Sequence, residues 1–187
     1  MSTLMLYTVG HSTRPLEELV TLLKSAHVAT LVDVRAQPRS QHNPQFNDSS
    51  LRAACEQAGM IYHWAGRQLG GMRAPQANSP HRALAEGRRG FADYMDSEVF
   101  KKGAAQLQQW AARGVCAMLC AERDPAHCHR ALIADYLSLQ GLRVVHLIAA
   151  NESHEHLLSP QARRESAALI YDRQTTGRLA LNMKENS

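Results

Sequence analysis

The chain has 187 residues, of which 44% are hydrophobic and 20% are charged, and its formal net charge is +4. This length and composition fit one globular domain with a sizeable core. No apolar run approaches the roughly 20 residues that a membrane-spanning helix needs, so we expect no membrane partner. The modestly basic balance is compatible with an anionic partner but does not require one.

The cysteines and the N-terminus both favour a reducing compartment. Four unevenly clustered cysteines do not make a disulfide framework for a chain of this length. The first residues, MSTLMLYTVGHS, lack the basic region and the cleavage site of a signal peptide. We therefore expect a cytoplasmic protein.

In the first third of the chain, short apolar segments alternate with segments of helical periodicity. Residues 15–25 and 48–58 are the expected helices, and Gly59 ends the second one. The expected strands lie at residues 4–9, 29–34 and 60–64.

Residues 65–89 are the least regular part of the chain and include LGGMR and the basic pair Arg88-Arg89. A segment of this length usually contains a functional loop or small helices. After it the alternation resumes. The expected helices lie at residues 97–113, 129–140 and 161–171, and the expected strands at residues 115–119 and 143–149.

This alternation predicts an α/β fold with a mostly parallel sheet of about five strands, covered on both faces by helices. We expect a single domain over residues 1–172, followed by a polar, loosely held tail over residues 173–187. The pattern does not predict the strand order or the oligomeric state.

Polar side chains follow four of the expected strands. In an open α/β sheet, ligands bind beyond the carboxyl ends of the strands, so these side chains are the candidates for a shared site. The candidates are His11 and Ser12, then Asp33, Arg35 and Arg39, then Arg73, and finally Cys120, Glu122, Cys128, His129 and Arg130.

The arginines predict an anion site. Guanidinium groups bind carboxylate or phosphate through two parallel hydrogen bonds, and a helix that begins near His129 adds backbone donors. The predicted anion-binding residues are Ser12, Asp33, Arg35, Arg39, Arg73, His129 and Arg130. The alternative is that Arg35 pairs with a nearby carboxylate and the other guanidinium groups are solvated.

Cys120 and Cys128 allow three interpretations. Beside His129 and Arg130 at a helix start, Cys128 has the environment of a reactive thiolate, and Cys120 shares it. The second interpretation is a zinc site formed by the two cysteines and His129, with His11 as an additional candidate ligand, but Cys-x7-Cys-His is not a standard zinc spacing, so we expect no metal. The third interpretation is that both cysteines are small, unreactive residues of the core. Cys55 and Cys116 are expected in the core.

His11 and Glu122 are the candidates for proton transfer. His11 follows a glycine at a strand end, where its ring can face a pocket. The predicted catalytic residues are therefore His11, Glu122, Cys120 and Cys128.

Five ordered motifs resemble one family. TVGHS, LVDVRAQPRS with NPQF, LGGMR, GFADYM and CAERDPAHCHRALIADYL are similar to the motifs of domain-of-unknown-function family 488, over roughly Tyr7 to Ile148. The resemblance implies a Rossmann-like three-layer fold with a shared polar site, but it implies no reaction and no cofactor. LVDVR also resembles a strand motif of rhodanese-like domains, although the spacing from Cys120 or Cys128 to Arg130 differs from that of a rhodanese loop.

Three functions follow from these observations. The first is an enzyme that acts on an anionic, phosphate- or nucleotide-containing substrate. The second is a non-catalytic module that binds nucleic acid through basic loops, Arg88-Arg89 among them. The third is a rhodanese-like sulfur-transfer or thiol redox protein.

Overall fold

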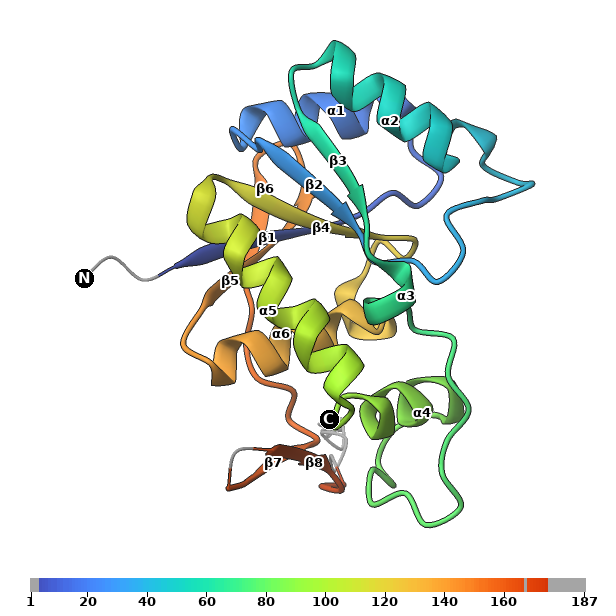
Figure 1. The fold of residues 1–187 in the computed structure, drawn as a ribbon, viewed down its shortest axis with the longest axis vertical. Coiled ribbons are helices and arrows are strands. Elements are labelled where there is room, and N and C mark those ends of the chain that lie inside the picture. Colours follow the sequence, from blue (N-terminus) through green and yellow to red (C-terminus); the bar gives the residue numbers. More distant parts are fainter. Residues whose placement is uncertain (1–3, 167, 175–187) are drawn as a thin grey trace, which may run out of the picture.

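A six-stranded sheet lies at the centre of the part of the chain that the structure, a computed structural model, describes, namely residues 4–166 and 168–174 (Figure 1). Neighbouring strands are parallel except β5 and β6, which are antiparallel. From one edge to the other, the strands are β3 (Ile61–Trp64), β2 (Thr30–Asp33), β4 (Cys116–Cys120), β1 (Met5–Gly10), β5 (Arg143–Ala149) and β6 (Glu152–Glu155). The prediction of a mostly parallel sheet is confirmed.

The central strand β4 explains why its sequence is apolar at every position. All of its residues are buried. Cys116 and Met118 belong to the core on one face of the sheet, and Ala117 and Leu119 to the core on the other. A strand that is covered on both faces has no position for a solvated side chain, which is why no polar alternation is visible in this segment.

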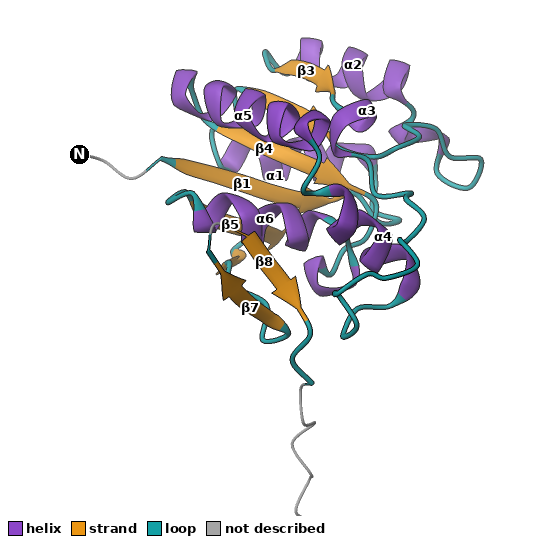
Figure 2. Cartoon of the chain, turned by 60° about the horizontal axis from the view of Figure 1, so that its bottom comes forward, coloured by secondary structure: helices purple, strands orange, loops and turns teal. Residues whose placement is uncertain are grey.

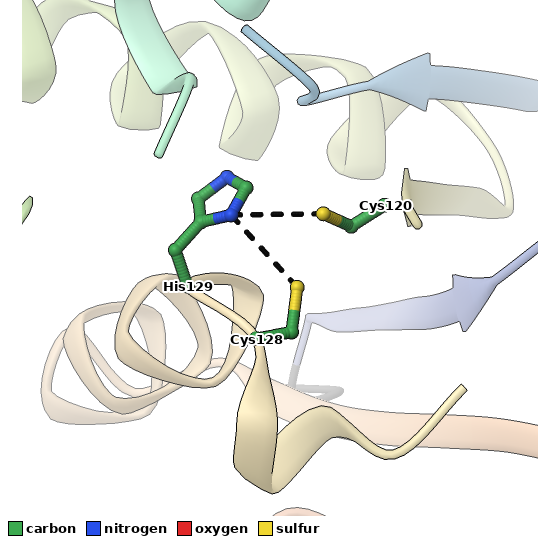
Figure 3. Close-up of side chains that lie close together, drawn as sticks. All are labelled: Cys120, Cys128 and His129. Carbon is green, nitrogen blue, oxygen red and sulfur yellow. Dashed lines mark hydrogen bonds between the residues drawn. The ribbon is translucent and has the colours of Figure 1, made fainter. Parts of the chain in front are cut away.

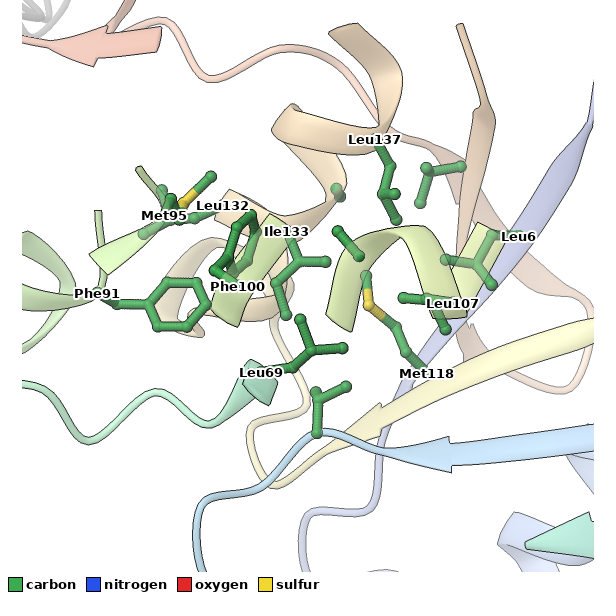
Figure 4. Packing of buried hydrophobic residues seen from close by; sticks show 14 of the residues in the cluster. Leu6, Leu69, Phe91, Met95, Phe100, Leu107, Met118, Leu132, Ile133 and Leu137 are labelled. Carbon is green, nitrogen blue, oxygen red and sulfur yellow. The ribbon is translucent and has the colours of Figure 1, made fainter. Parts of the chain in front are cut away.

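Helices cover both faces of the sheet and complete the three-layer, Rossmann-like fold. Helices α1 (Leu16–Ser25) and α2 (Asp48–Gln57) contribute apolar side chains to the core on one face. Helices α5 (Glu98–Arg113) and α6 (Arg130–Leu139) pack on the opposite face, in front of the sheet in Figure 2. Figure 4 shows this second core, where leucine and isoleucine side chains of α5 and α6 meet Met118 of the sheet.

The irregular segment between β3 and α5 contains short helices, as the sequence predicts. They are α3 (Gly66–Leu69) and α4 (Glu86–Tyr94). Two 3-10 turns, Pro44–Phe46 and Pro125–His127, interrupt the loops that follow β2 and β4. Helix α3 begins directly after β3, so it lies at the same edge of the sheet as the loops that follow β2 and β4.

The helix expected at residues 161–171 is wrong, because this segment is a hairpin of β7 (Ala162–Glu165) and β8 (Ala168–Tyr171). Ala162, Leu169 and Tyr171 are buried, whereas Arg163 lies at the surface and pairs with Asp172 at 2.8 Å. Burial of one face and exposure of the other is the strand pattern. A φ of 53° at Ser166 lies in the turn.

Strand β6 is also absent from the sequence prediction, because all of its residues are exposed and no apolar alternation reveals it. The expected tail covers residues 173–187, of which 175–187 lie outside the described residues. The domain boundary at residue 172 stays a prediction. Among the helices that the structure describes, none is long and apolar enough to span a membrane.

Candidate active site

A pocket of about 620 Å³ lies at the carboxyl ends of β2 and β4. Strand β4 lies between β2 and β1, with Asp33 opposite Leu119 and Gly10 opposite Cys120. The loops that follow these strands therefore meet at one edge of the sheet, where ligands bind in folds of this type. The lining includes one glycine, Gly71, and the polar or reactive residues Arg35, Arg39, Arg88, Cys120, Glu122, His127, Cys128 and His129.

Two thiols and an imidazole converge in this pocket (Figure 3). Cys120 is the last residue of β4, whereas Cys128 and His129 directly precede α6. The Nδ1 atom of His129 lies 3.6 Å from the Cys120 sulfur and 3.8 Å from the Cys128 sulfur. Both cysteines are buried, so their only exposure is toward the pocket that they line.

The hydrogen bonds of His129 determine which of its ring nitrogens faces the thiols with a lone pair. Its Nε2 atom lies 3.1 Å from the carbonyl oxygen of Val34 and 3.0 Å from that of Leu69. Carbonyl oxygens only accept, so Nε2 carries the proton and donates to them. In the neutral ring, Nδ1 is then an acceptor, or a metal ligand, aimed at both sulfurs.

Packing holds the imidazole in this orientation. The Phe91 ring contacts it edge-on, with 4.9 Å between ring centroids. A Cβ atom at Gly71 would lie 2.5 Å from the His129 ring, which is closer than non-bonded atoms approach. The second glycine of LGGMR is therefore required because the imidazole lies directly against its backbone.

The two thiols differ in ionisation. The neighbouring Cys120 thiol, together with His129 and Arg130, lowers the pKa of Cys128 well below its ordinary value despite its burial. The neighbouring Cys128 and burial raise the pKa of Cys120 well above its ordinary value. The surroundings thus favour ionisation of Cys128 over that of Cys120.

Cationic side chains surround this cluster. Arg39 is exposed at the pocket, and Arg88 of α4 donates from Nη1 to the Ala126 carbonyl oxygen at 2.8 Å. Within residues 4–166 and 168–174, the buried Nε of Arg88 has no hydrogen-bond partner. Glu122 is the exposed carboxylate of the lining. The sequence analysis assigned Arg88 only to the nucleic-acid alternative, because nothing in its local pattern indicates that α4 folds over the pocket.

A second polar cluster, formed by His11, Asp33, Arg35 and Tyr62, lies beside the pocket and is closed. The Asp33 carboxylate accepts from Arg35 Nε at 2.9 Å and from the Tyr62 hydroxyl at 2.8 Å. Arg35 also donates to the Phe46 carbonyl oxygen at 2.8 Å and to His11 Nε2 at 3.1 Å. Arg35 therefore meets a carboxylate of its own protein, although its side chain still reaches the pocket wall.

Both ring nitrogens of His11 are used within the protein. Its Nδ1 lies 2.8 Å from the Ser12 carbonyl oxygen, so this nitrogen donates and Nε2 accepts from Arg35. The ring stacks on Phe46, and burial lowers the pKa of His11. His11 lies outside the group formed by the two thiols and His129. Its catalytic assignment stays a prediction, and its contacts are those of a residue that positions Arg35.

Arg130 and Arg73 have protein partners. Arg130 is fully buried and donates to the carbonyl oxygens of Glu122 and Arg123, the latter at 2.7 Å. It thereby holds the loop that follows β4, which crosses so close to Gly10 that a Cβ there would collide with the Glu122 carbonyl. Arg73 donates to the carbonyl oxygens of Gly70 and of Arg67 in α3. Their assignment to an anion stays a prediction, as does that of Ser12, whose backbone nitrogen donates to the Ala121 carbonyl oxygen.

A chain of buried polar groups joins β1, β5 and α6 behind the loop. The Thr8 hydroxyl lies 2.7 Å from His146 Nδ1, and His146 Nε2 lies 2.9 Å from His156 Nδ1. His156 Nε2 in turn lies 2.9 Å from an Asp135 carboxylate oxygen, which fixes the direction of donation along the chain. The Tyr171 hydroxyl donates to the other oxygen of Asp135. The sequence analysis did not predict this network, whose members come from distant segments.

The fold and the pocket together define an α/β protein of Rossmann-like type with a thiol–imidazole cluster at the carboxyl ends of its strands. The family described as domain of unknown function DUF488 matches residues 15–137, which is more than half of the chain. The chain belongs to this family, as its motifs predict. No curated protein and no solved structure matches this chain. The looser similarity to rhodanese-like domains stays a prediction.

Proposed function

We propose that this protein is an enzyme that acts on an anionic, phosphate- or nucleotide-containing substrate, with the cluster of Cys120, Cys128 and His129 as its reactive centre. One observation carries the proposal: two thiols and an imidazole converge at the inner end of a pocket whose wall carries guanidinium groups. Thiols and imidazoles react with a substrate that is bound in a fixed position, and the guanidinium groups supply the positive charge that binds it.

Arg39 and Arg88 are the substrate-binding residues that the contacts favour. Arg39 is exposed toward the pocket, and Arg88 reaches the same wall from α4 with a buried Nε that lacks a protein partner in the described residues. Arg35 is the third cation, but its charge is balanced by Asp33. A hydrogen bond between charged groups contributes about 1.5–3 kcal/mol, so one such bond from Arg39 or from Arg88 accounts for roughly a tenfold to a hundredfold gain in anion affinity.

Glu122 is the proposed proton-transfer residue. Its carboxylate lies in the pocket lining and is exposed, and its backbone carbonyl is fixed by Arg130. The fixed backbone holds the side chain at the pocket while leaving its carboxylate free to approach a bound molecule.

Ligand binding tests this proposal directly. A panel of pyrophosphate, nucleoside monophosphates and sugar phosphates is titrated into the reduced protein and followed by NMR chemical shifts. We expect at least one ligand to shift resonances around the pocket, and the double variant Arg39→Ala/Arg88→Ala to bind it at least tenfold more weakly. Arg113→Ala, an exposed arginine at the end of α5, is the matched control and should bind as the wild type does. Equal affinity in the double variant and the wild type would contradict the proposal.

Thiol redox chemistry is the second candidate, and the proximity of the sulfurs favours it. The ligand atoms of Cys120, Cys128 and His129 all lie within 4.8 Å of one another. Hydrogen peroxide would take two electrons and two protons from the thiols, forming one disulfide and two water molecules. Mass spectrometry would then show a Cys120–Cys128 link, with Cys55 and Cys116 still reduced because both are buried in the cores.

The structure favours the enzyme over a nucleic-acid-binding module. Arg88 faces the pocket, and Arg89 donates to the Leu84 carbonyl oxygen, so the basic pair does not extend together from the surface. Binding to a duplex or single strand that weakens steeply with salt would revive that alternative.

A further inference from the structure

We propose that Cys120, Cys128 and His129 bind a divalent metal ion of the zinc class, with its fourth coordination position open to the pocket. The inference deepens the proposed function, on which it rests only for the role of the pocket as the substrate site. The non-standard spacing of the three residues along the chain argued against a metal, but the fold removes that argument. The end of β4 and the start of α6 bring Cys120 and the Cys128-His129 pair together in space.

The two sulfur–nitrogen distances in the cluster fit a tetrahedral site. With zinc–sulfur bonds of about 2.3 Å and zinc–nitrogen bonds of about 2.0–2.1 Å, tetrahedral angles place sulfur and nitrogen ligands roughly 3.6 Å apart. The observed separations from His129 Nδ1 are 3.6 Å to Cys120 and 3.8 Å to Cys128. Nδ1 of His129 thus lies at nearly equal distances from the two sulfur atoms, as one ligand of a shared metal ion does.

The opposite side of the imidazole carries the support that metal-binding histidines have. Such a histidine usually donates its other ring N–H to a carbonyl or carboxylate, which fixes the tautomer and the ring orientation. The single Nε2–H of His129 is shared between the carbonyl oxygens of Val34 and Leu69. The backbone of Gly71 and the edge of Phe91 confine the ring between them. The ligand nitrogen is thus preorganised.

Three protein ligands leave one position for a ligand from the pocket. In the part of the chain that the structure describes, no fourth His, Cys, Asp or Glu joins this group. All three residues line the pocket, so the free position faces the space where the anionic substrate would lie. Structural zinc sites close the sphere with four protein ligands, and catalytic sites keep one position for water or substrate.

The donor set selects the class of metal. Two sulfurs and one imidazole nitrogen suit zinc and comparable transition metals and do not suit magnesium or calcium, which take oxygen ligands. Binding converts both thiols to thiolates and releases their protons to solvent, and the two negative charges balance the charge of the ion. When bound, such an ion polarises a substrate oxygen or activates a water molecule.

Metal titration of the chelator-treated, reduced protein tests the inference without any substrate. Cobalt(II) reports thiolate ligation through its sulfur-to-metal charge-transfer absorption, and zinc competition then measures zinc affinity. We expect one ion per chain for the wild type, and at least a tenfold loss of affinity in Cys120→Ser, in Cys128→Ser and in His129→Ala. Cys55→Ala, which removes a buried thiol from α2 on the opposite face of the sheet, should bind as the wild type does. Circular dichroism of each metal-free variant checks that it is folded.

The outcomes separate this inference from the proposed function. Failure of the folded, reduced wild-type protein to bind cobalt or zinc stoichiometrically overturns the metal site, even if the anion panel still binds. A metal affinity that is the same in Cys128→Ser as in the wild type also overturns it. The double variant Arg39→Ala/Arg88→Ala should keep the wild-type metal affinity while losing the anion, and if it keeps the anion, only the proposed function fails.

Discussion

Two polar clusters lie side by side at the carboxyl ends of the strands, and they differ in how completely their groups are used. In the closed cluster of His11, Asp33, Arg35 and Tyr62, each side chain has a partner within the protein. In the open cluster of Cys120, Cys128 and His129, one imidazole nitrogen faces two sulfurs beside a pocket. The closed cluster contains the residue types of an active site, yet its side chains are bonded to one another and to the backbone.

The comparison teaches that residue type at a strand end does not by itself identify chemistry. Buried charges are retained where they are paired, and removal of one partner is costly because the other stays buried. An electron-pair donor that lies beside a pocket and is not fully used by protein partners indicates a ligand-binding site. The closed cluster should therefore control stability, and the open cluster should control ligand binding.

The largest expected effect is on the closed cluster. Asp33→Ala leaves the Arg35 guanidinium buried without its carboxylate, so we expect the free energy of unfolding to fall by about 3–5 kcal/mol. Urea denaturation measures it. Glu122→Ala, which removes an exposed carboxylate at the pocket, serves as the control and should change stability by less than about 0.5 kcal/mol. A loss below about 1 kcal/mol for Asp33→Ala would show that the closed cluster is not a stability element.

Gly71→Ala should disturb the open cluster from behind. Its Cβ collides with the His129 ring, so we expect a loss of about 1–3 kcal/mol in stability from overpacking and a metal affinity reduced roughly tenfold to a hundredfold. Gly87→Ala offers a matched control, because nothing lies within 4 Å of its Cβ position. If Gly71→Ala binds metal as the wild type does, the imidazole is not a ligand.

Acid should lower the stability through the buried hydrogen-bond network of Thr8, His146, His156 and Asp135. Burial, with His156 and Arg130 nearby, lowers the pKa of His146 to about 3. The unfolded chain takes up this proton below about pH 6.5 and the folded chain does not, so stability falls as the pH drops from about 6.5 toward 3. Between pH 7 and pH 5 we expect this residue to account for a loss of about 2 kcal/mol.

Urea denaturation at both pH values measures that loss. His146→Gln should flatten the dependence, whereas His154→Gln, which replaces an exposed histidine of β6, should keep it. An unchanged slope in His146→Gln would assign the acid sensitivity to other groups.

The smallest stability effect is expected for Cys128→Ser in the metal-free protein. The hydroxyl occupies the place of the thiol near His129, so the free energy of unfolding should change by less than about 1 kcal/mol. Thermal denaturation of metal-free and zinc-loaded protein checks both halves of the comparison. Zinc should raise the melting temperature of the wild type and leave that of Cys128→Ser nearly unchanged.

Local patterns were sufficient to predict most of the fold. Apolar strands and amphipathic helices predicted the parallel sheet and its cover, because burial dictates both patterns. They were not sufficient where charged residues form strands, as in β6 and in the hairpin near Arg163. There, pairing between segments decides the structure, and the local pattern does not show it.

The convergence of polar residues at one edge of the sheet was also predictable, because the carboxyl ends of parallel strands face the same edge. The contacts of these residues were not, because they depend on distant backbone atoms. Arg130 donates to carbonyls at residues 122 and 123, and Arg88 reaches the pocket only because α4 folds over it. His129 becomes a directed donor only through carbonyls at residues 34 and 69.

The position of β4 between β1 and β2 has a consequence for synthesis on the ribosome. The strands β1 and β2, which flank β4, are not hydrogen-bonded to each other. Among the described strands, β1 pairs with β4 and β5, and both are translated much later. A nascent chain that ends before residue 116 therefore exposes β1 with two unpaired edges, which is an aggregation hazard. Protection of β1 is thus needed until β4 has left the exit tunnel, and the cysteine–histidine cluster forms only after residue 129 has emerged.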